Sequence, residues 1–350
     1  MFKGRGTSEN PTNRFLSTTV EGGDYVQYVP GEELEPAPHT QFFDDPSRTI
    51  LTKNSSPDVG FDYSVNPYRG CEHGCVYCYA RPTHEFLGLS AGVDFETKIF
   101  VKKNAPELLR EKLESKSWKG EPINLSGITD CYQPVERKLR LTRGIVEVLA
   151  EFRNPFSIIT KNHLVTRDID LLRPMAELGA TMVLVSVATL DGKLSEKLEP
   201  RTSHPDSRLR AIEKLAEAGI PVGTMVAPLI PGLTDHELPA ILKAVRSAGA
   251  EYAGYVPLRL PYVLDELFGD WLAQHYPLQK EKVLNRIREI RQGKLNSSEF
   301  GNRMRGEGPY ADHLNSMFKL YTRKEGLNQK SLELSSEHFK RPSAQRDFGF

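Results

Sequence analysis

Three of the four cysteines in this 350-residue chain lie close together, at Cys71, Cys75 and Cys78. The first two are separated by three residues and the last two by two. Three thiolates on one short loop can surround a compact soft-metal centre. They do not make up a four-thiolate set, and their spacing differs from the paired C-x2-C halves of structural zinc sites. On a four-iron cubane they leave one iron open to a substrate or cofactor, and an open coordination position is typical of a reactive site.

A structural zinc site is the alternative for these thiols, with His73 or His84 as the fourth ligand. His73 lies between Cys71 and Cys75, and a loop that short can hardly present all four groups tetrahedrally. Spacing alone often misleads. The sequence therefore favours the reactive centre and leaves the zinc site as an alternative.

Composition places this centre in a folded protein. Hydrophobic residues make up 39% and charged residues 26% of the chain, which is enough for a sizeable core. The net charge is zero, which argues against a general polyanion-coating protein but leaves room for a local basic patch. Clustered thiols also differ from the dispersed cysteines of a secreted disulfide framework. Since no signal peptide is visible and the longest apolar stretch is residues 181–189, we expect a soluble, cytoplasmic protein without a membrane span.

The elements that must position the cysteines alternate between strands and helices. Apolar runs and helical periodicity predict strands at residues 123–126, 156–160, 181–188, 222–228 and 252–258, and helices at residues 140–152, 169–178, 206–218 and 236–248. Such alternation is typical of βαβ units with right-handed crossovers and a parallel sheet. About six units fit between Tyr63 and Leu260, fewer than the eight of a closed barrel. We therefore predict a partial α/β barrel, (β/α)6, with its chemistry at the C-terminal ends of the strands.

The two ends of the chain differ from this middle part. Residues 1–47 are acidic, rich in Gly, Pro, Thr and Asn, and without helical or strand periodicity, so we expect an extended N-terminal arm. The barrel is expected to cover residues 48–262, a basic α-helical extension residues 263–326, and a flexible tail residues 327–350. The aromatic residues expected to dock the arm are Phe15, Tyr25, Tyr28, Phe42 and Phe43.

The C-x3-C-x2-C motif, with the aromatic Tyr77 just before its last cysteine, resembles the signature of the radical S-adenosylmethionine (SAM) superfamily. From about Arg48 to Leu260 the sequence is similar to the branch that includes spore photoproduct lyase and DNA repair photolyase-like relatives. The resemblance implies that the three cysteines hold a [4Fe-4S] cluster whose open iron binds the amino and carboxylate groups of SAM. It further implies reductive cleavage of SAM to a 5′-deoxyadenosyl radical that abstracts a hydrogen atom. A low-potential electron donor, such as a flavodoxin or ferredoxin, is then needed.

The segment after the predicted strand at residues 123–126 is a candidate for the cofactor amine. It contains Gly127, Thr129 and Asp130. Glycine lets backbone groups approach a ligand closely, and the Thr and Asp side chains can accept a hydrogen bond from an amine. The resemblance implies this role for the strand end, although the family usually carries a Gly-Gly-Glu-like segment there. The alternative is a Thr-Asp cap for the helix that follows.

Further polar residues follow the next strands. Lys161 comes after the strand at residues 156–160, and Ser186 lies late in the following strand, where the resemblance implies contacts to the cofactor carboxylate or ribose. Tyr77 joins these cofactor-binding candidates through its place in the cysteine motif. Arg201 and Arg208 are additional carboxylate candidates. The ordinary alternatives are solvated charges for the basic residues and a hydroxyl bonded to its neighbours for Ser186.

Cys131 is a candidate hydrogen-atom donor. The resemblance points to spore photoproduct lyase, which carries a hydrogen-donating cysteine beside this strand end. Gly127 occupies that place here, and Cys131 lies four residues further on. Free cysteine is also a common buried hydrophobe, which is the alternative role for Cys131.

The basic extension is a candidate nucleic-acid surface. Its arginines and nearby aromatic residues are Arg286, Arg288, Arg291, Arg303, Arg305, Tyr310, Phe318 and Tyr321. Such a mixture suits phosphate contact and base stacking, but residues 280–291 also fit an ordinary amphipathic helix. We therefore expect a radical SAM enzyme of lyase-like or radical-modifying type, acting on an unknown substrate such as a nucleic-acid lesion or modified base. The alternatives are a protein or small-molecule substrate, or a non-enzymatic metal-binding nucleic-acid module.

Overall fold

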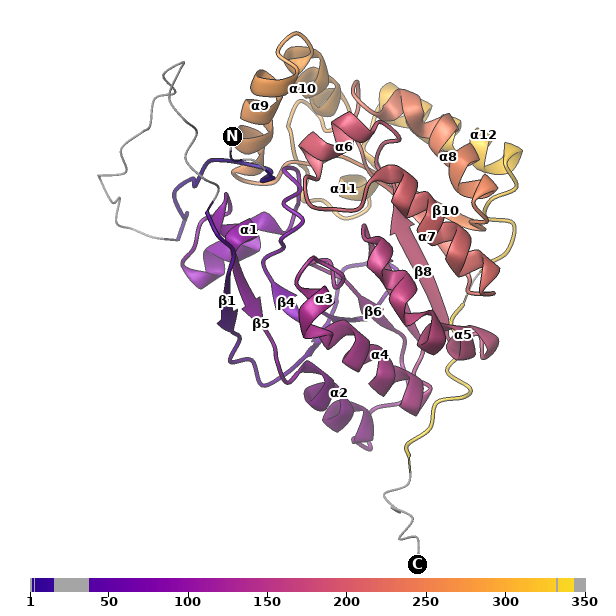
Figure 1. The fold of residues 1–350 in the computed structure, drawn as a ribbon. Coiled ribbons are helices and arrows are strands. Elements are labelled where there is room, and N and C mark those ends of the chain that lie inside the picture. The colour runs from indigo at the N-terminus through magenta and orange to yellow at the C-terminus, as the bar shows by residue number, and fades with distance from the viewer. Residues whose placement is uncertain (1, 3, 16–37, 332, 343–350) are drawn as a thin grey trace, which may run out of the picture.

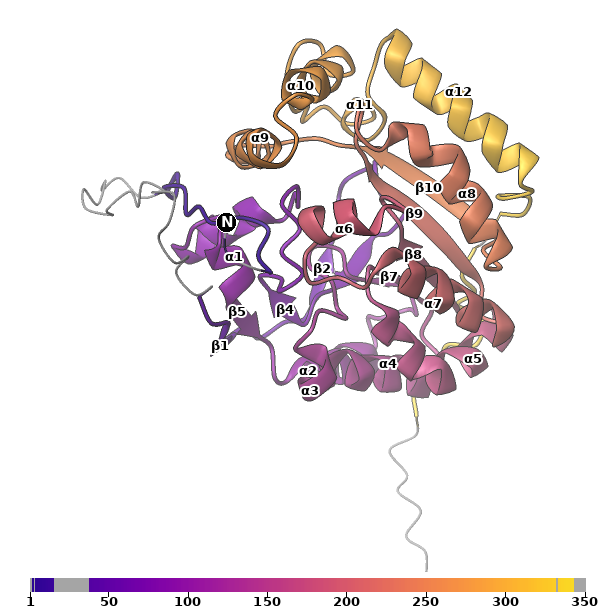
Figure 2. The same cartoon turned by 45° about the horizontal axis from the view of Figure 1, so that its top comes forward.

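A computed structural model describes residues 2, 4–15, 38–331 and 333–342 of the chain, and its centre is a seven-stranded sheet (Figures 1 and 2). In spatial order the strands are β10 (Tyr252–Pro257), β9 (Val222–Leu229), β8 (Thr181–Ser186), β7 (Phe156–Thr160), β6 (Ile123–Leu125), β3 (Tyr63–Val65) and β2 (Leu51–Lys53). All run parallel except β2, which pairs with β3 in the antiparallel sense. Within the described residues β10 and β2 do not pair, so the predicted partial (β/α)6 barrel is confirmed.

Helices cover the outer face of this sheet, as Figure 2 shows. The longer ones are α2 (Ala105–Glu114), α4 (Leu141–Phe152), α5 (Ile169–Glu177), α7 (Pro205–Glu217) and α8 (Leu238–Ser247). Shorter helices lie between them: the 3-10 helices η2 (His163–Asp168) and η3 (Asp235–Glu237), and the α-helices α3 (Glu136–Leu139) and α6 (Gly192–Leu198). α7 illustrates the local signals, since the His204 side chain accepts from the Asp206 N–H at its start and Gly219, at φ +73°, follows its end.

The two faces of the sheet differ in exposure. Ile158 of β7 and Val183 of β8 point toward the helices and are fully buried in the main hydrophobic core. Their neighbours Ile159 and Leu184 point to the inner face and are only half-buried. Because strand side chains alternate between faces, the inner face lines a space that solvent reaches. This space lies at the expected place for chemistry in a partial barrel.

A second, three-stranded sheet lies beside the first (Figure 1). Its central strand β5 (Lys98–Val101) is parallel to β1 (Gln41–Asp44) and antiparallel to β4 (Tyr68–Arg69). β4 leads directly into Cys71, and η1 (Arg81–Leu87) and α1 (Asp94–Thr97) lead from the cysteines back to β5. The small sheet therefore frames the cysteine loop from both of its ends.

The N-terminal segment, residues 4–15, packs on the connection between the cysteines and β5. Arg5, Thr7 and Asn13 are buried there. The Asn13 amide donates to the Glu85 and Leu89 carbonyl oxygens at 2.8 and 3.0 Å. Docking is thus made by polar residues, whereas aromatic residues were expected to provide it.

Of the predicted docking aromatics, Phe42 and Phe43 are exposed on β1. Phe15 is also exposed and stacks on Phe86. Tyr25 and Tyr28 lie outside the described residues. Phe43 stacks on Phe100 of β5, so the exposed rings of Phe15 and Phe43 each contact another ring, while the buried contacts of the segment are polar. Those polar groups find their partners on a loop distant in sequence, which a local apolar pattern does not reveal.

The C-terminal extension consists of α9 (Leu264–His275), α10 (Lys280–Glu289), α11 (Asn302–Arg305) and α12 (Pro309–Lys324). α12 packs on α8, and its Phe318 ring lies 4.7 Å from the Tyr255 ring of β10. α11 spans the gap between the two edges of the large sheet. Its Arg303 pairs with Asp58, in the connection between β2 and β3, and donates to the Ser56 hydroxyl. None of the described helices is both long and apolar enough to cross a membrane.

The tail from residue 327 makes specific contacts, unlike the flexible tail expected from its polar composition. Leu327 is buried, and the Asn328 side chain both accepts from and donates to the backbone of Ala253 on β10. Further on, the Lys340 N–H donates to the Phe152 carbonyl oxygen at 2.9 Å. Backbone hydrogen bonds hold this segment, and composition does not report them. Residues 343–350 lie outside the described residues.

Candidate active site

The three cysteines lie on a tight loop between β4 and η1. Cys71 and Cys75 are buried and Cys78 is half-buried. The loop turns at Gly74, whose φ of +67° suits glycine. A Cβ at this position would lie 2.5 Å from the Glu96 carboxylate, so a larger residue does not fit. The sequence therefore forms a compact loop with three sulfurs and little room for change.

A fully buried arginine holds this loop in place. Arg81 donates from Nε to the Cys75 carbonyl oxygen at 2.8 Å and from Nη2 to the Gly74 carbonyl oxygen at 3.1 Å. It also forms a buried ion pair with Glu96. The other oxygen of Glu96 accepts from the Gly6 N–H at 2.9 Å. The N-terminal segment, Glu96 and Arg81 thus form one network behind the cysteines.

The protein environment raises the pKa of two of the three thiols, Cys75 and Cys78. Burial and the nearby Glu199 carboxylate raise the pKa of Cys75 well above its ordinary value, despite the opposing charge of Lys161. Burial and the Cys71 sulfur raise the pKa of Cys78 to about 11. A thiophilic metal centre binds thiolates and releases their protons. Three soft donors on one loop, with the pKa raised at Cys75 and Cys78, fit an iron–sulfur cluster.

The geometry favours a cluster over a single ion. In the part of the chain that the structure describes, no three His, Cys, Asp or Glu side chains converge as the ligands of one metal ion. A cubane takes one thiolate on each of three irons, so its protein ligands stand farther apart than those of a zinc ion.

The two histidines of the zinc alternative are engaged elsewhere. Burial opposes a charge on His73, but the Asp130 carboxylate and the Cys71 sulfur raise its pKa to about 10, so it is an imidazolium without a free lone pair. The His84 Nε2 lies 3.0 Å from the Lys98 carbonyl oxygen, and its buried Nδ1 has no hydrogen-bond partner among the described residues. Within that part of the chain, neither histidine converges with the cysteines as a ligand of one metal ion.

Asp130 links the cysteine loop to the end of β7. Its carboxylate accepts from the Thr160 hydroxyl and the Lys161 N–H, each at 2.7 Å, and lies 3.3 Å from the His73 ring. These partners hold the pKa of Asp130 low against the effect of burial. The predicted Thr129 hydroxyl donates to the Tyr68 carbonyl oxygen at 2.9 Å. In this structure both side chains are used to join the strand ends to the loop.

Gly127 contacts the residue that follows the last cysteine. The Tyr79 hydroxyl donates to the Gly127 carbonyl oxygen at 2.7 Å. A Cβ on Gly127 would lie 2.9 Å from the Ser64 Cβ, so the close approach of β3 requires glycine. The backbone at this predicted position therefore faces the cysteine loop.

Tyr77 and Lys161 meet at a buried carboxylate that the sequence did not single out. The Tyr77 hydroxyl donates to Glu199, which is buried in the loop after α6. The Lys161 ammonium lies 3.7 Å from the same carboxylate and donates to the Ala227 carbonyl oxygen at 3.0 Å. Burial lowers the pKa of Lys161, and the Cys75 sulfur opposes that shift. Lys161 thus supplies a positive charge beside the sulfurs.

The two candidate arginines bind protein carboxylates. Arg208 is buried, pairs with Glu199 and donates to the Ser186 carbonyl oxygen at 3.0 Å. Arg201 pairs with Glu72, next to Cys71, at 3.0 Å. Ser186 is itself buried. The structure therefore brings Tyr77, Lys161 and Ser186 together through Glu199 and Arg208, and no local pattern distinguishes Glu199 from the chain's other acids.

Cys131 does not reach the inner space. It is 0% exposed and belongs to the main hydrophobic core on the helical side of the sheet. Its N–H donates to the Ser126 hydroxyl at 2.8 Å and its carbonyl oxygen accepts from the Thr142 hydroxyl at 2.6 Å. The side chain of Asp130 is bonded toward the cysteine loop. The next residue, Cys131, points the other way, into the core. This placement agrees with the buried-hydrophobe alternative and corrects the expected access to substrate.

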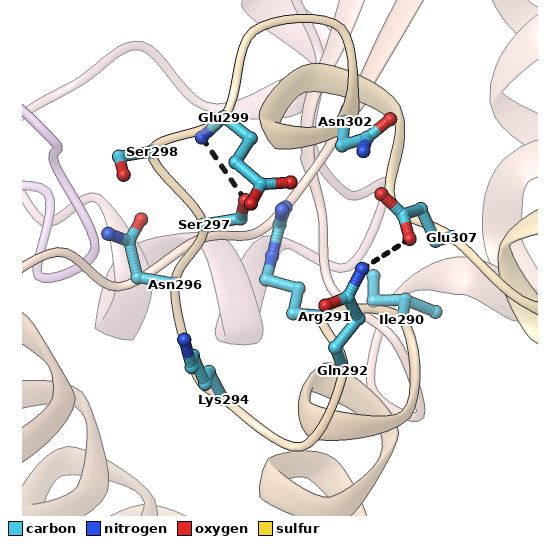
Figure 3. Close-up of a pocket in the computed structure, with 10 residues that line it drawn as sticks. All are labelled: Ile290, Arg291, Gln292, Lys294, Asn296, Ser297, Ser298, Glu299, Asn302 and Glu307. Carbon is cyan, nitrogen blue, oxygen red and sulfur yellow. Dashed lines mark hydrogen bonds between the residues drawn. The ribbon is translucent and has the colours of Figure 1, made fainter.

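The basic extension uses several of its arginines internally. Arg291 is buried and donates to the carbonyl oxygens of Pro257 and Leu258, just beyond β10. Arg303 pairs with Asp58, and Arg286 with Glu289. Figure 3 shows Arg291 among the polar residues lining a cavity of about 270 Å³ in this extension. Arg291 and Arg303 thus attach the extension to the barrel, and Arg286 pairs within α10.

Comparisons with known proteins agree with this geometry. The family model described as "Radical SAM superfamily" matches residues 65–245. An uncharacterized protein of Mycobacterium tuberculosis is 39% identical over 232 residues, covering 66% of this chain and 67% of its own length. Spore photoproduct lyase of Bacillus subtilis is 25% identical over 189 residues, covering 52% and 49% of the two chains.

Solved structures of spore photoproduct lyase share the fold. One variant superposes with a TM-score of 0.57 at 17% identity, covering 84% of this chain and 86% of its own. Another, with a TM-score of 0.55, 16% identity and the same coverage, contains bound AdoMet and a dinucleoside spore photoproduct.

Proposed function

This chain belongs to the radical S-adenosylmethionine superfamily, and on that premise we propose that it is an enzyme in which Cys71, Cys75 and Cys78 hold a [4Fe-4S] cluster beside bound SAM. When bound, the cluster and SAM together supply a 5′-deoxyadenosyl radical that takes a hydrogen atom from the substrate. The observation that carries this proposal is the set of three sulfurs, two buried and one half-buried, held on one loop that Arg81 bonds from behind.

The residues around the sulfurs have distinct tasks in this proposal. Lys161 offsets the negative charge of the thiolates and presents an ammonium to the cofactor carboxylate. The Gly127 backbone follows β6 and Ser186 ends β8, on either side of β7, where they border the cofactor space. Asp130 and Tyr77 act through others, because they fix His73 and Glu199 respectively.

The half-buried inner face holds the substrate near the cluster. Ile159, Leu184 and Met225 line it with apolar surface and leave it partly open. An apolar lining shields a radical from bulk water and from side reactions. The cluster also needs a reductant, and we propose a low-potential donor such as a flavodoxin or ferredoxin.

We propose a nucleic acid as the substrate, with a lesion or modified base as the reacting group. This is supported by the likeness to spore photoproduct lyase, whose structure contains a dinucleoside. A protein or small-molecule substrate would use the same cofactor site without salt-sensitive binding to nucleic acid.

The test of the cofactor chemistry is a cleavage assay without oxygen. The protein is reconstituted with iron and sulfide, reduced with dithionite, and assayed by chromatography for 5′-deoxyadenosine formed from SAM. We expect about four irons per chain and 5′-deoxyadenosine from the native protein, and neither from Cys71→Ala. Cys131→Ala is the matched control, because it removes a cysteine outside the site and leaves cleavage intact. A fully loaded cluster that never cleaves SAM, or cleavage that persists in Cys71→Ala, contradicts the proposal.

A further inference from the structure

Arg259 differs from the other buried arginines of the protein. It lies two residues beyond β10, at the same sheet edge as the cysteine loop, and is half-buried. Arg81, Arg208 and Arg291 each donate several hydrogen bonds to the protein. Among the residues that the structure describes, the Arg259 guanidinium has neither a hydrogen-bond acceptor nor an ion-pair partner. An unpaired, partly desolvated cation is costly, so this one calls for an explanation.

The backbone around Arg259 is rigidly held. Leu258 and Leu260 on either side are buried, and their N–H groups donate to the Leu229 and Leu295 carbonyl oxygens at 2.9 and 3.0 Å. The Leu258 carbonyl oxygen also accepts from the buried Arg291 guanidinium. The side chain of Arg259 is therefore presented from a fixed position.

The carboxylate whose charge acts on Arg259, that of Asp58, is already engaged by other groups. Burial and the neighbouring Arg303 both lower the pKa of Arg259. The nearest acid, Asp58, already pairs with Arg303 and accepts from the Gly301 N–H. Two arginines thus share one carboxylate, and an added anion would satisfy Arg259.

Tyr79 places Arg259 next to the reacting centre. The Arg259 guanidinium carbon lies 5.4 Å from the centroid of the Tyr79 ring. Tyr79 directly follows Cys78, and its hydroxyl reaches Gly127 after β6. One side chain therefore spans from the β10 side of the mouth to the β6 side, beside the cluster loop. An anion bound to Arg259 would therefore lie on one side of the Tyr79 ring, with the cysteine loop on the other.

Exposed aromatic rings continue outward from this point. Tyr262, three residues after Arg259, is 64% exposed at φ +56° and stacks on the Arg14 guanidinium at 3.7 Å. Arg14 also lies 4.7 Å from the ring of Phe15, which stacks on Phe86. Exposed rings and guanidinium planes offer faces on which bases can stack. A cation for phosphate beside faces for bases is the combination that a single strand of nucleic acid requires.

We propose that Arg259 binds a backbone phosphate of a single-stranded nucleic-acid substrate and thereby positions the reacting base beside Tyr79 and the cluster. The inference rests on the proposed function, and it names the residue through which the substrate is held. Arg259 acts as a positioning residue, because it contacts the phosphate and not the reacting atoms.

The test measures binding of a short, fluorescein-labelled oligothymidylate by anisotropy over a range of salt concentrations. We expect Arg259→Gln to weaken binding about tenfold and to reduce the slope of log Kd against log salt by about 0.7, the contribution of one phosphate on a single strand. Arg210→Gln is the matched control, since it removes an equal charge from the exposed face of α7 and leaves both quantities unchanged. An oligomer with neutral methylphosphonate linkages should bind the native protein and Arg259→Gln equally weakly.

A second measurement separates substrate from cofactor. Equilibrium binding of SAM to the reconstituted protein should change less than about twofold in Arg259→Gln. If SAM binding falls and oligonucleotide binding does not, the guanidinium holds the cofactor carboxylate and the proposal is overturned. Unchanged binding of both probes, or failure of the native protein to bind the oligonucleotide, also overturns it. Because oligonucleotide binding is read without SAM cleavage, this proposal and the proposed function can fail separately.

Discussion

Arg81 and Arg259 stand on two sides of the barrel mouth, and they are bonded in contrasting ways. Arg81 is fully buried behind the cysteine loop, where it meets four backbone carbonyl oxygens and the Glu96 carboxylate. Arg259 is half-buried beyond β10 and stacks on the Tyr79 ring, with no hydrogen bond or ion pair to the residues that the structure describes. On the Arg81 side, the guanidinium makes its hydrogen bonds to the protein. On the Arg259 side, the guanidinium N–H groups have no acceptor among the described residues.

The two bonding patterns suit two different roles, holding the backbone of the protein and binding a ligand. A buried charge whose bonds are all made to the protein fixes the backbone around it, as the cluster loop requires. A charge held rigidly without a partner is prepared for something that arrives later, because its desolvation has already occurred. The two sides are therefore distinguished by whether their arginine has hydrogen-bond and ion-pair partners in the protein.

The largest effect is expected on the Arg81 side. Arg81→Met leaves Glu96 buried without its counterion and should lower the free energy of unfolding by about 3–5 kcal/mol. Arg110→Met removes the exposed pair with Glu151 and should cost less than about 1 kcal/mol. Urea denaturation of both variants measures the difference. Equal losses would mean that Arg81 is no more than a surface charge.

A pH titration should reveal a weak point on the same side. Burial lowers the pKa of His84 to about 4, so the native state keeps it neutral while the unfolded chain, at about 6.5, takes up a proton. The free energy of unfolding should therefore fall as the pH drops from above 6.5 to about 4, by about 3 kcal/mol at most. His84→Gln should remove this part of the pH dependence in urea denaturation. A profile identical to that of the native protein would refute the assignment.

A methyl group should disturb the contact between the N-terminal segment and the loop. In Gly6→Ala the new Cβ would meet the Gly74 carbonyl oxygen at 1.7 Å, which forces the segment away and should cost about 1–3 kcal/mol. Gly60→Ala, where no atom lies within 4 Å, provides the control. Thermal unfolding gives the stability, and iron analysis after reconstitution shows whether the loop still retains its cluster. Matching behaviour of the two variants would argue against the contact.

The smallest effect on stability is expected on the Arg259 side. Arg259→Gln removes no hydrogen bond or ion pair among the described residues, so the free energy of unfolding should change by less than about 1 kcal/mol. Urea denaturation beside Arg81→Met tests the comparison directly. A loss as large as that of Arg81→Met would show that Arg259 supports the fold.

The fold could be predicted because its signals are local. The apolar run at residues 181–188 predicts a strand, and the helical spacing at residues 206–218 predicts a helix, without reference to distant residues. The structure has them at Thr181–Ser186 and Pro205–Glu217. The cysteines are equally local, since all three lie on one loop. The hydrogen-bond partners could not be predicted from the sequence. Tyr77 and Glu199 are 122 residues apart, and Gly6 and Glu96 are 90 apart. Only the tertiary structure brings such partners together.

Cys131 shows that residues close in the sequence can also be placed wrongly by sequence reasoning. Its distance from Gly127 in the sequence is short, so a place in the cavity was a reasonable hypothesis. The turn that follows Asp130 decides otherwise, because the carboxylate bonds to Thr160 and Lys161 and the next residue enters the core. One hydrogen-bonded side chain thus changes which face its neighbour occupies.

The closure by α11 has a consequence for the size of what can enter. Within the described residues the ring of strands is completed by side chains, through Arg303, Asp58 and Ser56, and not by a ladder of backbone hydrogen bonds between β10 and β2. Separating the two edges would break this ion pair and side-chain hydrogen bonds, and no strand pairing. For the nucleic acid proposed as substrate, this geometry favours entry of an internal stretch from the side over threading from a free end.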